Sequence, residues 1–158
     1  MGCVQMDTVT YPNDKVKAFI QENLIAVRLP HDVQPLAGQF KVTWTPTFVI
    51  LDQDGQEHHR AVGFEAPEEF IPFLLLGMAK IKFDQNDFPK AIALLERVTG
   101  EYPQSDWAAE SVYLLGVSHY KTTHQTQYLK QTYETLKAKY PNSEWVKRAQ
   151  PYSLLPNP

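Results

Sequence analysis

The sequence contains very little cysteine, with Cys3 as the one thiol among 158 residues. A single cysteine excludes an internal disulfide framework and a cysteine-based metal cluster. Long apolar runs are also missing, because the longest, Phe70–Met78, is about half of the roughly 18 residues that span a bilayer and contains Pro72. We therefore expect no membrane span, and the residues after Met1 do not have the pattern of a signal peptide.

An excess of positive charge is missing as well. The net charge is −3, and the sequence pI is about 5.9, so the chain has no basic footprint and we expect no nucleic-acid partner. The histidines have no ligand spacing: His58 and His59 are adjacent and point to opposite faces if they lie on a strand. No glycine-rich phosphate loop is present. We expect no bound metal and no cofactor.

The first half of the chain alternates helix and strand signals. Helical patterns cover residues 4–10, 36–40 and a stretch that ends near Leu24, for which Asn13 or Asp14 is the predicted N-cap. Apolar, β-branched runs predict strands at Leu24–Leu29 and Thr47–Leu51, the first of them buried. Residues 52–56 read as a hairpin turn in which Gly55 takes a positive φ, and residues 58–63 return as the partner strand.

The second half has helical patterns only, and it repeats itself. The helix predicted from Pro67 to about Phe83 contains Pro72, which should kink it or mark a boundary between two parts of the protein. Residues 101–110 (EYPQSDWAAE) and 139–148 (KYPNSEWVKR) share the frame Tyr-Pro-x-Ser-acid-Trp. The two prolines of this frame are 38 residues apart, which is within the range of helical-hairpin repeats.

This repeat resembles the tetratricopeptide family over roughly Pro72–Ala149. In the first copy, Ala79 and Ala91 fall at the two positions where small residues allow close helix approach. Asp87-Phe88 falls at the turn before the second helix, and Leu95 and Val98 fall at its packing positions. In the second copy the matching positions are Gly116, Tyr133, Leu136 and Pro141, while Leu129 replaces an expected alanine. The Tyr-Pro-x-Ser ending is similar to the variety found in bacterial envelope proteins. The resemblance implies a protein or peptide partner.

The aromatic residues of the repeated frame have two possible roles. Trp107, Trp145, Tyr102 and Tyr140 are expected to join one repeat to the next. The alternative is a peptide groove, and its candidate residues are Tyr113, Tyr120, Lys121 and Lys130.

The stretch TWTPTFVILDQDG (Thr43–Gly55) resembles thioredoxin-like proteins, and the resemblance extends over roughly Gly2–Phe73. It implies a cis bond between Thr45 and Pro46, and it implies that these two residues present backbone groups to an incoming peptide. GCVQMD then resembles the second half of a Cys-x-x-Cys motif at the start of a helix. Cys3 would be its second, resolving thiol, and the nucleophilic cysteine would stand before Met1, which suggests a shortened start.

Three interpretations of Cys3 remain open. A thiol near a helix N-terminus favours the thiolate and hence redox chemistry. A half-buried structural thiol without a partner is the second interpretation, because a dithiol cycle needs two cysteines. Lipidation after Gly2 is the third, although Met6 stands where a myristoylation signal requires Ser or Thr.

The predicted fold is therefore α/β plus all-α: an incomplete thioredoxin-like sheet followed by two tetratricopeptide-like hairpins. We expect a thioredoxin-like domain at residues 1–72, helical repeats at residues 73–150 and a C-terminal tail at residues 151–158. The absent central strand would leave a gap between the strands at Leu24–Leu29 and Thr47–Leu51, each with an unpaired edge. We expect one of three consequences: a homodimer that fills the gap, direct pairing of the two strands, or a marginally stable first half.

Two functions are compatible with this sequence. The first is a thioredoxin-like protein of the thiol–disulfide oxidoreductase lineage, whose tetratricopeptide-like repeats bind a protein. Cys3 would be its resolving thiol, and Thr45 and Pro46 would bind the substrate. The alternative is a non-catalytic adaptor on a thioredoxin scaffold, because the chain lacks the nucleophilic cysteine that a thiol–disulfide enzyme requires. The resemblance suggests a bacterial protein, and the sequence leaves its compartment open between the cytoplasm and the periplasm.

Overall fold

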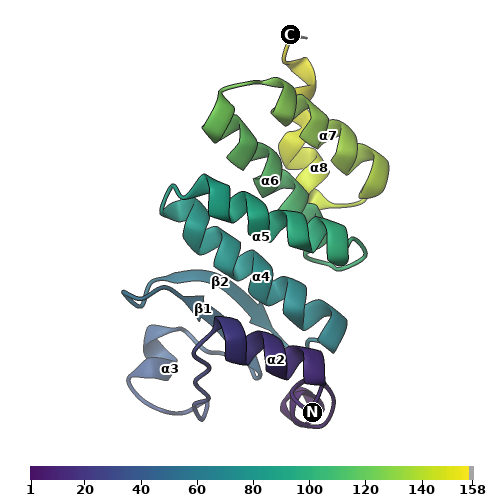
Figure 1. Cartoon of the computed structure of the whole chain (residues 1–158). Helices are drawn as coiled ribbons and strands as arrows, with labels where there is room; N and C mark the ends of the chain where they lie inside the picture. Colours follow the sequence, from purple (N-terminus) through teal and green to yellow (C-terminus); the bar gives the residue numbers. More distant parts are fainter. Residues whose placement is uncertain (157–158) are drawn as a thin grey trace. The chain divides into compact units, whose positions relative to one another are not determined.

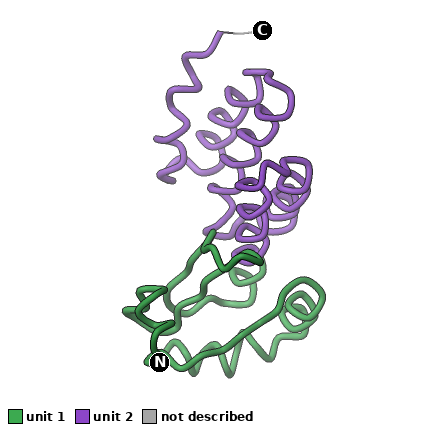
Figure 2. Tube along the Cα trace, turned by 90° about the vertical axis from the view of Figure 1, so that its left-hand side faces the viewer, with its two compact units in different colours: residues 1–71 green, residues 72–158 purple. Residues whose placement is uncertain are grey.

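The computed structural model describes residues 1–156, which divide into two compact units (Figures 1 and 2). Unit 1 is Met1–Ile71, and unit 2 begins at Pro72. The boundary lies inside the long helix α4 (Pro67–Asp84), directly before the proline at which the sequence predicts a kink or a boundary. No helix within the described residues is both long enough and apolar enough to cross a membrane.

Unit 1 begins with helical turns that end where the sequence predicts. Helix α1 (Gly2–Gln5) continues into the π-helical segment η1 (Met6–Thr10), and the chain turns at Tyr11-Pro12. Helix α2 (Asp14–Asn23) follows, and the Asn13 side chain accepts hydrogen bonds from the backbone N–H groups of Lys15 (3.0 Å) and Val16 (3.3 Å). Asn13 is therefore the N-cap, because it satisfies two of the donors that a helix start leaves open. The short helix α3 (Leu36–Gln39) also lies where it is predicted.

The sheet of unit 1 is a single antiparallel hairpin. Strand β1 (Thr47–Leu51) pairs with β2 (Glu57–Val62), with Thr47 opposite Val62 and Ile50 opposite His59. Gly55 has a φ of +78° in the connecting turn, as the sequence predicts. Because β2 is the only neighbour of β1 among the described residues, the other edge of β1 is unpaired.

The prediction of a buried strand at Leu24–Leu29 is wrong. The segment is irregular, and the exposed fractions of Ile25, Val27 and Leu29 are 96%, 74% and 50%. A strand requires a neighbour for its backbone N–H and C=O groups, and no described strand lies beside this segment. The apolar composition therefore identifies a segment suited to the middle of a sheet, but residues 1–156 contain no strands that could pair with it on either side.

The core of unit 1 forms between the hairpin and the helices on either side of it in the sequence. Its buried side chains include Met6, Val16, Phe19, Ile50, Ala61, Phe70 and Ile71. Phe70 at the start of α4 contacts two other rings, Phe48 of β1 with ring centroids 4.9 Å apart and Tyr11 at 6.1 Å. Thr10 adds a link, because its buried hydroxyl donates to the carbonyl of Glu65 (2.5 Å). These contacts hold the N-terminal turns against the segment that leads into α4.

Unit 2 contains helices and no strand within its described residues. It is formed by the greater part of α4, then α5 (Phe88–Glu101), α6 (Ala108–Thr123), α7 (Gln127–Lys139), α8 (Glu144–Ala149) and the 3₁₀ turn η2 (Gln150–Leu154). Asp87 caps α5 through the backbone N–H of Lys90 (3.4 Å), at the turn that the repeat pattern predicts. The buried core of the first hairpin is Leu76, Ala79, Ala91 and Leu95. Ala79 and Ala91 therefore occupy the interior positions at which small residues are expected.

The repeated frame has a repeated packing role. Trp107 contacts Phe73 of α4 with ring centroids 5.3 Å apart, and Trp145 contacts Tyr113 of α6 at 5.1 Å. The Tyr140 hydroxyl donates to the carbonyl of Pro103 (2.7 Å), which joins the second frame directly to the first. The prediction that these aromatic residues join successive repeats is confirmed for both tryptophans and for Tyr140.

Candidate functional site

The candidate thiol site lies in unit 1, at the start of α1. Cys3 is in the first turn of this helix and is half-buried. Its neighbour Gly2 lies against Pro46, so closely that a Cβ atom at position 2 would be 2.7 Å from Pro46 Cδ and 3.6 Å from the backbone nitrogen of Phe64. A real side chain does not fit at that distance from a proline ring. Glycine at position 2 therefore allows the first helical turn to contact the Thr45-Pro46 loop.

The Thr45-Pro46 loop precedes β1 and leaves one residue with unused backbone groups. The peptide bond between Thr45 and Pro46 is cis, and so is the bond between Gln34 and Pro35, which the sequence did not indicate. The Pro46 carbonyl accepts from the N–H of Gly63 (2.8 Å), which closes the end of the hairpin. Thr45 is exposed, and its backbone N–H and C=O form no hydrogen bond within residues 1–156. These two groups are therefore free to form hydrogen bonds outside unit 1.

A charged pair joins η1 to the irregular segment that follows α2. Arg28 donates two hydrogen bonds to the Asp7 carboxylate, at 2.6 and 3.1 Å. This contact lowers the pKa of Asp7 and raises the pKa of Arg28. Burial raises the pKa of the Tyr11 phenol, and the Arg28 charge acts in the opposite direction as a smaller cause. Asp7, Tyr11 and Arg28 therefore influence one another's pKa, a grouping that the sequence did not indicate.

A second group of polar side chains occupies the hairpin turn. The Asp52 carboxylate accepts from the backbone N–H groups of Asp54 and Gln56, each at 2.9 Å, and its other oxygen lies 2.9 Å from His58 Nε2. The hydrogen bond to His58 is the main cause that lowers the pKa of Asp52. His59 points to the other face, where it is buried. Within residues 1–156 no three potential metal ligands come together, here or elsewhere.

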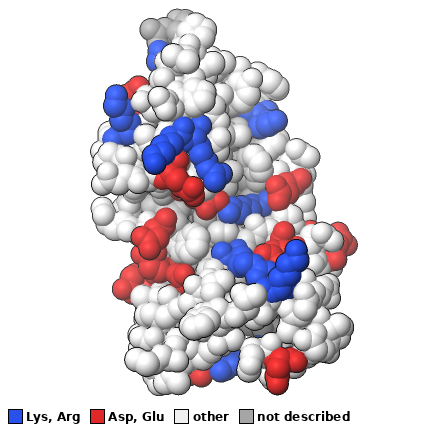
Figure 3. Space-filling view, turned by 180° about the vertical axis from the view of Figure 1, so that it is seen from behind, with Lys and Arg blue, Asp and Glu red and all other residues white. Residues whose placement is uncertain are grey.

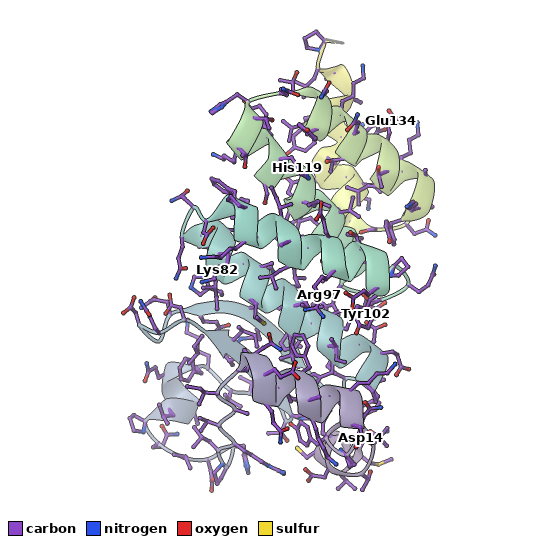
Figure 4. All side chains as sticks on the ribbon, viewed as in Figure 1. Asp14, Lys82, Arg97, Tyr102, His119 and Glu134 are labelled. Carbon is purple, nitrogen blue, oxygen red and sulfur yellow. The ribbon has the colours of Figure 1, made fainter. Side chains whose placement is uncertain are left out.

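Unit 2 has a hollow of about 250 Å³ between α5, α6 and α7. Val112, Leu115 and Gly116 are among its lining residues, and His119 (labelled in Figure 4) and Lys139 supply polar groups. Of the groove residues predicted from the sequence, none lines this hollow. Tyr113 instead contacts Trp145 and shares a 2.9 Å hydrogen bond with the hydroxyl of Tyr152.

Two residues were missed by sequence analysis. Gly2 gave no signal beyond its position beside Cys3, and its role depends on the contact with Pro46. Tyr152 lies in the stretch interpreted as a tail, yet its ring stacks on Tyr113 with centroids 5.9 Å apart. Burial, followed by the hydrogen bond with Tyr113, raises the pKa of the Tyr152 phenol. The sequence signal that could have identified Tyr152 is its position as an aromatic residue shortly after α8.

Comparison with known protein families gives one match for each half of the chain. A family model described as a thioredoxin-like domain matches residues 1–76. A second model, YfiO, described as an outer membrane lipoprotein, matches residues 74–152. No curated protein and no solved structure matched the chain.

Proposed function

Because the chain has a thioredoxin-like domain at residues 1–76 and belongs at residues 74–152 to the YfiO family, we propose that it is a protein-binding member of the thiol–disulfide oxidoreductase lineage. In this proposal the tetratricopeptide-like helices hold a protein partner. Cys3 exchanges with a disulfide of that partner, and Thr45 and Pro46 position the partner's extended backbone. The observation that carries the proposal is the contact of Gly2 with Pro46, because it brings the thiol-bearing turn to the loop with the unused Thr45 groups.

The chemistry available to one thiol is a single exchange. The Cys3 thiolate attacks one sulfur of a partner disulfide, a mixed disulfide forms, and the other partner sulfur leaves as a thiolate. Because the sequence contains no second cysteine, no internal thiol can release the partner. The chain as printed should therefore trap a partner rather than turn it over.

The experiment combines a turnover assay with intact-mass measurement. Reduction of insulin by a dithiol reductant should proceed at the reductant's own rate when the protein is present. Incubation with oxidised glutathione should add one glutathione, and Cys3→Ser should add none. Catalytic turnover that disappears in Cys3→Ser would contradict the trapping mechanism and indicate monothiol catalysis. A native protein without any adduct would contradict the redox role of Cys3.

The second candidate function is a non-catalytic adaptor, which the cysteine count favours. An adaptor needs the scaffold and the repeats but not the thiol. Binding of a protein partner that is equal in the wild type and in Cys3→Ser, together with an unreactive Cys3, would select this function. The description of the YfiO family supports a bacterial envelope location for either candidate.

A further inference from the structure

The two copies of the repeated frame have the same packing residues but opposite charges. The Tyr-Pro-x-Ser-acid-Trp positions agree at residues 102–107 and 140–145, and both tryptophans join neighbouring helices. Around the frame, Thr99, Glu101, Ala109 and Glu110 of the first copy correspond to Lys137, Lys139, Lys147 and Arg148 of the second. These four positions carry two negative charges in the first copy and four positive charges in the second.

The cations of the first copy are compensated locally. Arg97 Nε lies 3.0 Å from Glu101, Lys90 Nζ lies 2.9 Å from Asp87, and Lys80 forms a partly buried ion pair with Glu110. Figure 4 labels Arg97 and Tyr102 at the C-terminal end of α5. Each of these contacts joins two residues of unit 2, so these charges have partners within their own unit.

Three of the four cations of the second copy have no such partner among the described residues. Lys137, Lys139 and Lys147 are exposed and form no ion pair within the described residues. Arg148 is 3.5 Å from Glu144, lies over the Trp145 ring at 4.6 Å, and keeps a side-chain exposure of 57%. Figure 3 shows exposed Lys and Arg side chains in the upper part of the view, with Asp and Glu side chains beside some of them.

Helix stabilisation does not account for this charge. All four cations lie in the last turns of α7 and α8, where a positive charge interacts favourably with the helix dipole. However, the corresponding last turn of α5 has no basic residue and ends with Glu101. Since α5 forms with an acidic end, the same architecture does not require a basic end on α7.

We propose that Lys137, Lys139, Lys147 and Arg148, here called the basic surface, bind an acidic segment of a partner polypeptide. This inference rests on the proposed protein-binding role of the repeats and specifies the chemistry of the partner. Charge complementarity is the argument: these exposed cations lie at the ends of α7 and α8, two helices that contact each other, and they attract a segment rich in Asp and Glu. A polypeptide is favoured over nucleic acid because the whole chain is negative, with a net charge of −3.

The test measures fluorescence anisotropy of three labelled 12-residue peptides, Glu-Ser, Gln-Ser and Lys-Ser alternating, with the full chain. The Glu-Ser peptide should bind most tightly, and its affinity should fall with added salt. Replacing all four residues of the basic surface by Gln should weaken binding by about tenfold or more, since each exposed pair contributes modestly. The matched control replaces Lys15, Lys17, Lys82 and Lys90 by Gln, which removes the same charge elsewhere and should leave the affinity within about twofold.

Each other outcome overturns the proposal. Equal weakening by both variants would show that only net charge matters, and tighter binding of the Gln-Ser or Lys-Ser peptide would exclude an acidic partner. Tighter binding of phosphatidylglycerol vesicles or of a single-stranded oligonucleotide, lost in the basic-surface variant, would assign the surface to a membrane or to nucleic acid. Circular dichroism verifies that both variants are folded. The glutathione assay on Cys3 is independent of these results, so failure here is distinguishable from failure of the redox role.

Discussion

At the scale of single residues, Gly116 marks the closest approach between two helices. A Cβ atom on Gly116 in α6 would lie 1.6 Å from Oγ1 and 2.8 Å from Cβ of Thr132 in α7. Thr132 is buried and its hydroxyl donates to the Tyr128 carbonyl (2.7 Å), so it cannot move aside freely. The small residue that the tetratricopeptide pattern predicts at this position is therefore required sterically.

We predict that Gly116→Ala lowers the free energy of unfolding by about 1–3 kcal/mol, because the added methyl group overpacks the α6–α7 contact. Gly100→Ala is the matched control, since a Cβ there meets no atom within 4 Å. The control should be neutral or stabilising by up to about 1 kcal/mol, as alanine favours the helix. Urea unfolding of both variants measures the difference. Equal stability of the two variants would contradict the close α6–α7 approach.

The Asp52 carboxylate links the stability of the hairpin turn to pH. Hydrogen bonds from His58 and from two backbone N–H groups lower its pKa in the folded state. A carboxylate whose pKa is lower in the folded state stabilises the fold at pH values above its unfolded-state pKa of about 3.9. This stabilisation is lost as the pH falls through the folded-state pKa.

We therefore predict that the wild type loses unfolding free energy below about pH 4 more steeply than Asp52→Asn does. At neutral pH Asp52→Asn should be the less stable protein, because it lacks the charged acceptor. Thermal unfolding followed at several pH values from neutral to acidic measures both slopes. Asp54→Asn is the control, since the Asp54 side chain forms none of these contacts. Parallel pH profiles for the wild type and Asp52→Asn would refute this assignment.

At the scale of secondary-structure elements, the two tyrosines of the repeated frame provide a matched comparison. Tyr140 donates to the Pro103 carbonyl (2.7 Å), whereas the equivalent Tyr102 hydroxyl forms no hydrogen bond within the described residues. Burial raises the pKa of both phenols, and both rings are half-buried, so the two tyrosines can be compared directly.

We predict that Tyr140→Phe costs about 0.5–1.5 kcal/mol of unfolding free energy, the usual net contribution of one hydrogen bond. Tyr102→Phe should change stability by less than about 0.5 kcal/mol, because no hydrogen bond is lost. Chemical denaturation measures both values. A cost for Tyr102→Phe that matches or exceeds the cost for Tyr140→Phe would show that the link between frames is not formed.

At the scale of the whole molecule, unit 1 exposes apolar surface and one unpaired strand edge. Ile25 and Val27 are exposed in the irregular segment, and one edge of β1 pairs with no strand among the described residues. Exposed apolar segments and free edges favour association with other chains. A homodimer through this surface remains our proposal.

We predict concentration-dependent self-association of the wild type, and its loss in the double variant Ile25→Lys, Val27→Lys. Because both side chains are exposed, the double variant should keep its stability within about 1 kcal/mol. Sedimentation velocity over a range of concentrations measures association, and urea unfolding measures stability. Lys15→Gln with Lys17→Gln, on the exposed side of α2, serves as the control and should leave association unchanged. A wild type that remains monomeric, or a double variant that still associates, would exclude this surface.

The sequence by itself determined the elements whose signals are local. Four features depend on a few neighbouring residues and lie where they are predicted: the Asn13 cap, the turn at Gly55, β1, and the Tyr-Pro-x-Ser-acid-Trp frame. A cap, a turn and a repeat act through contacts within a few residues or recur at a fixed spacing, so one chain is enough to reveal them.

Only the tertiary structure decided the features that depend on distant partners. Leu24–Leu29 has the composition of a buried strand, but no strand within residues 1–156 pairs with it, so it stays irregular and mostly exposed. The contact of Gly2 with Pro46 and the ring stack of Tyr152 on Tyr113 join residues that are dozens of positions apart. Composition indicates which segment can pair or pack, but pairing and packing require a second surface, and the position of that surface is decided by the whole fold.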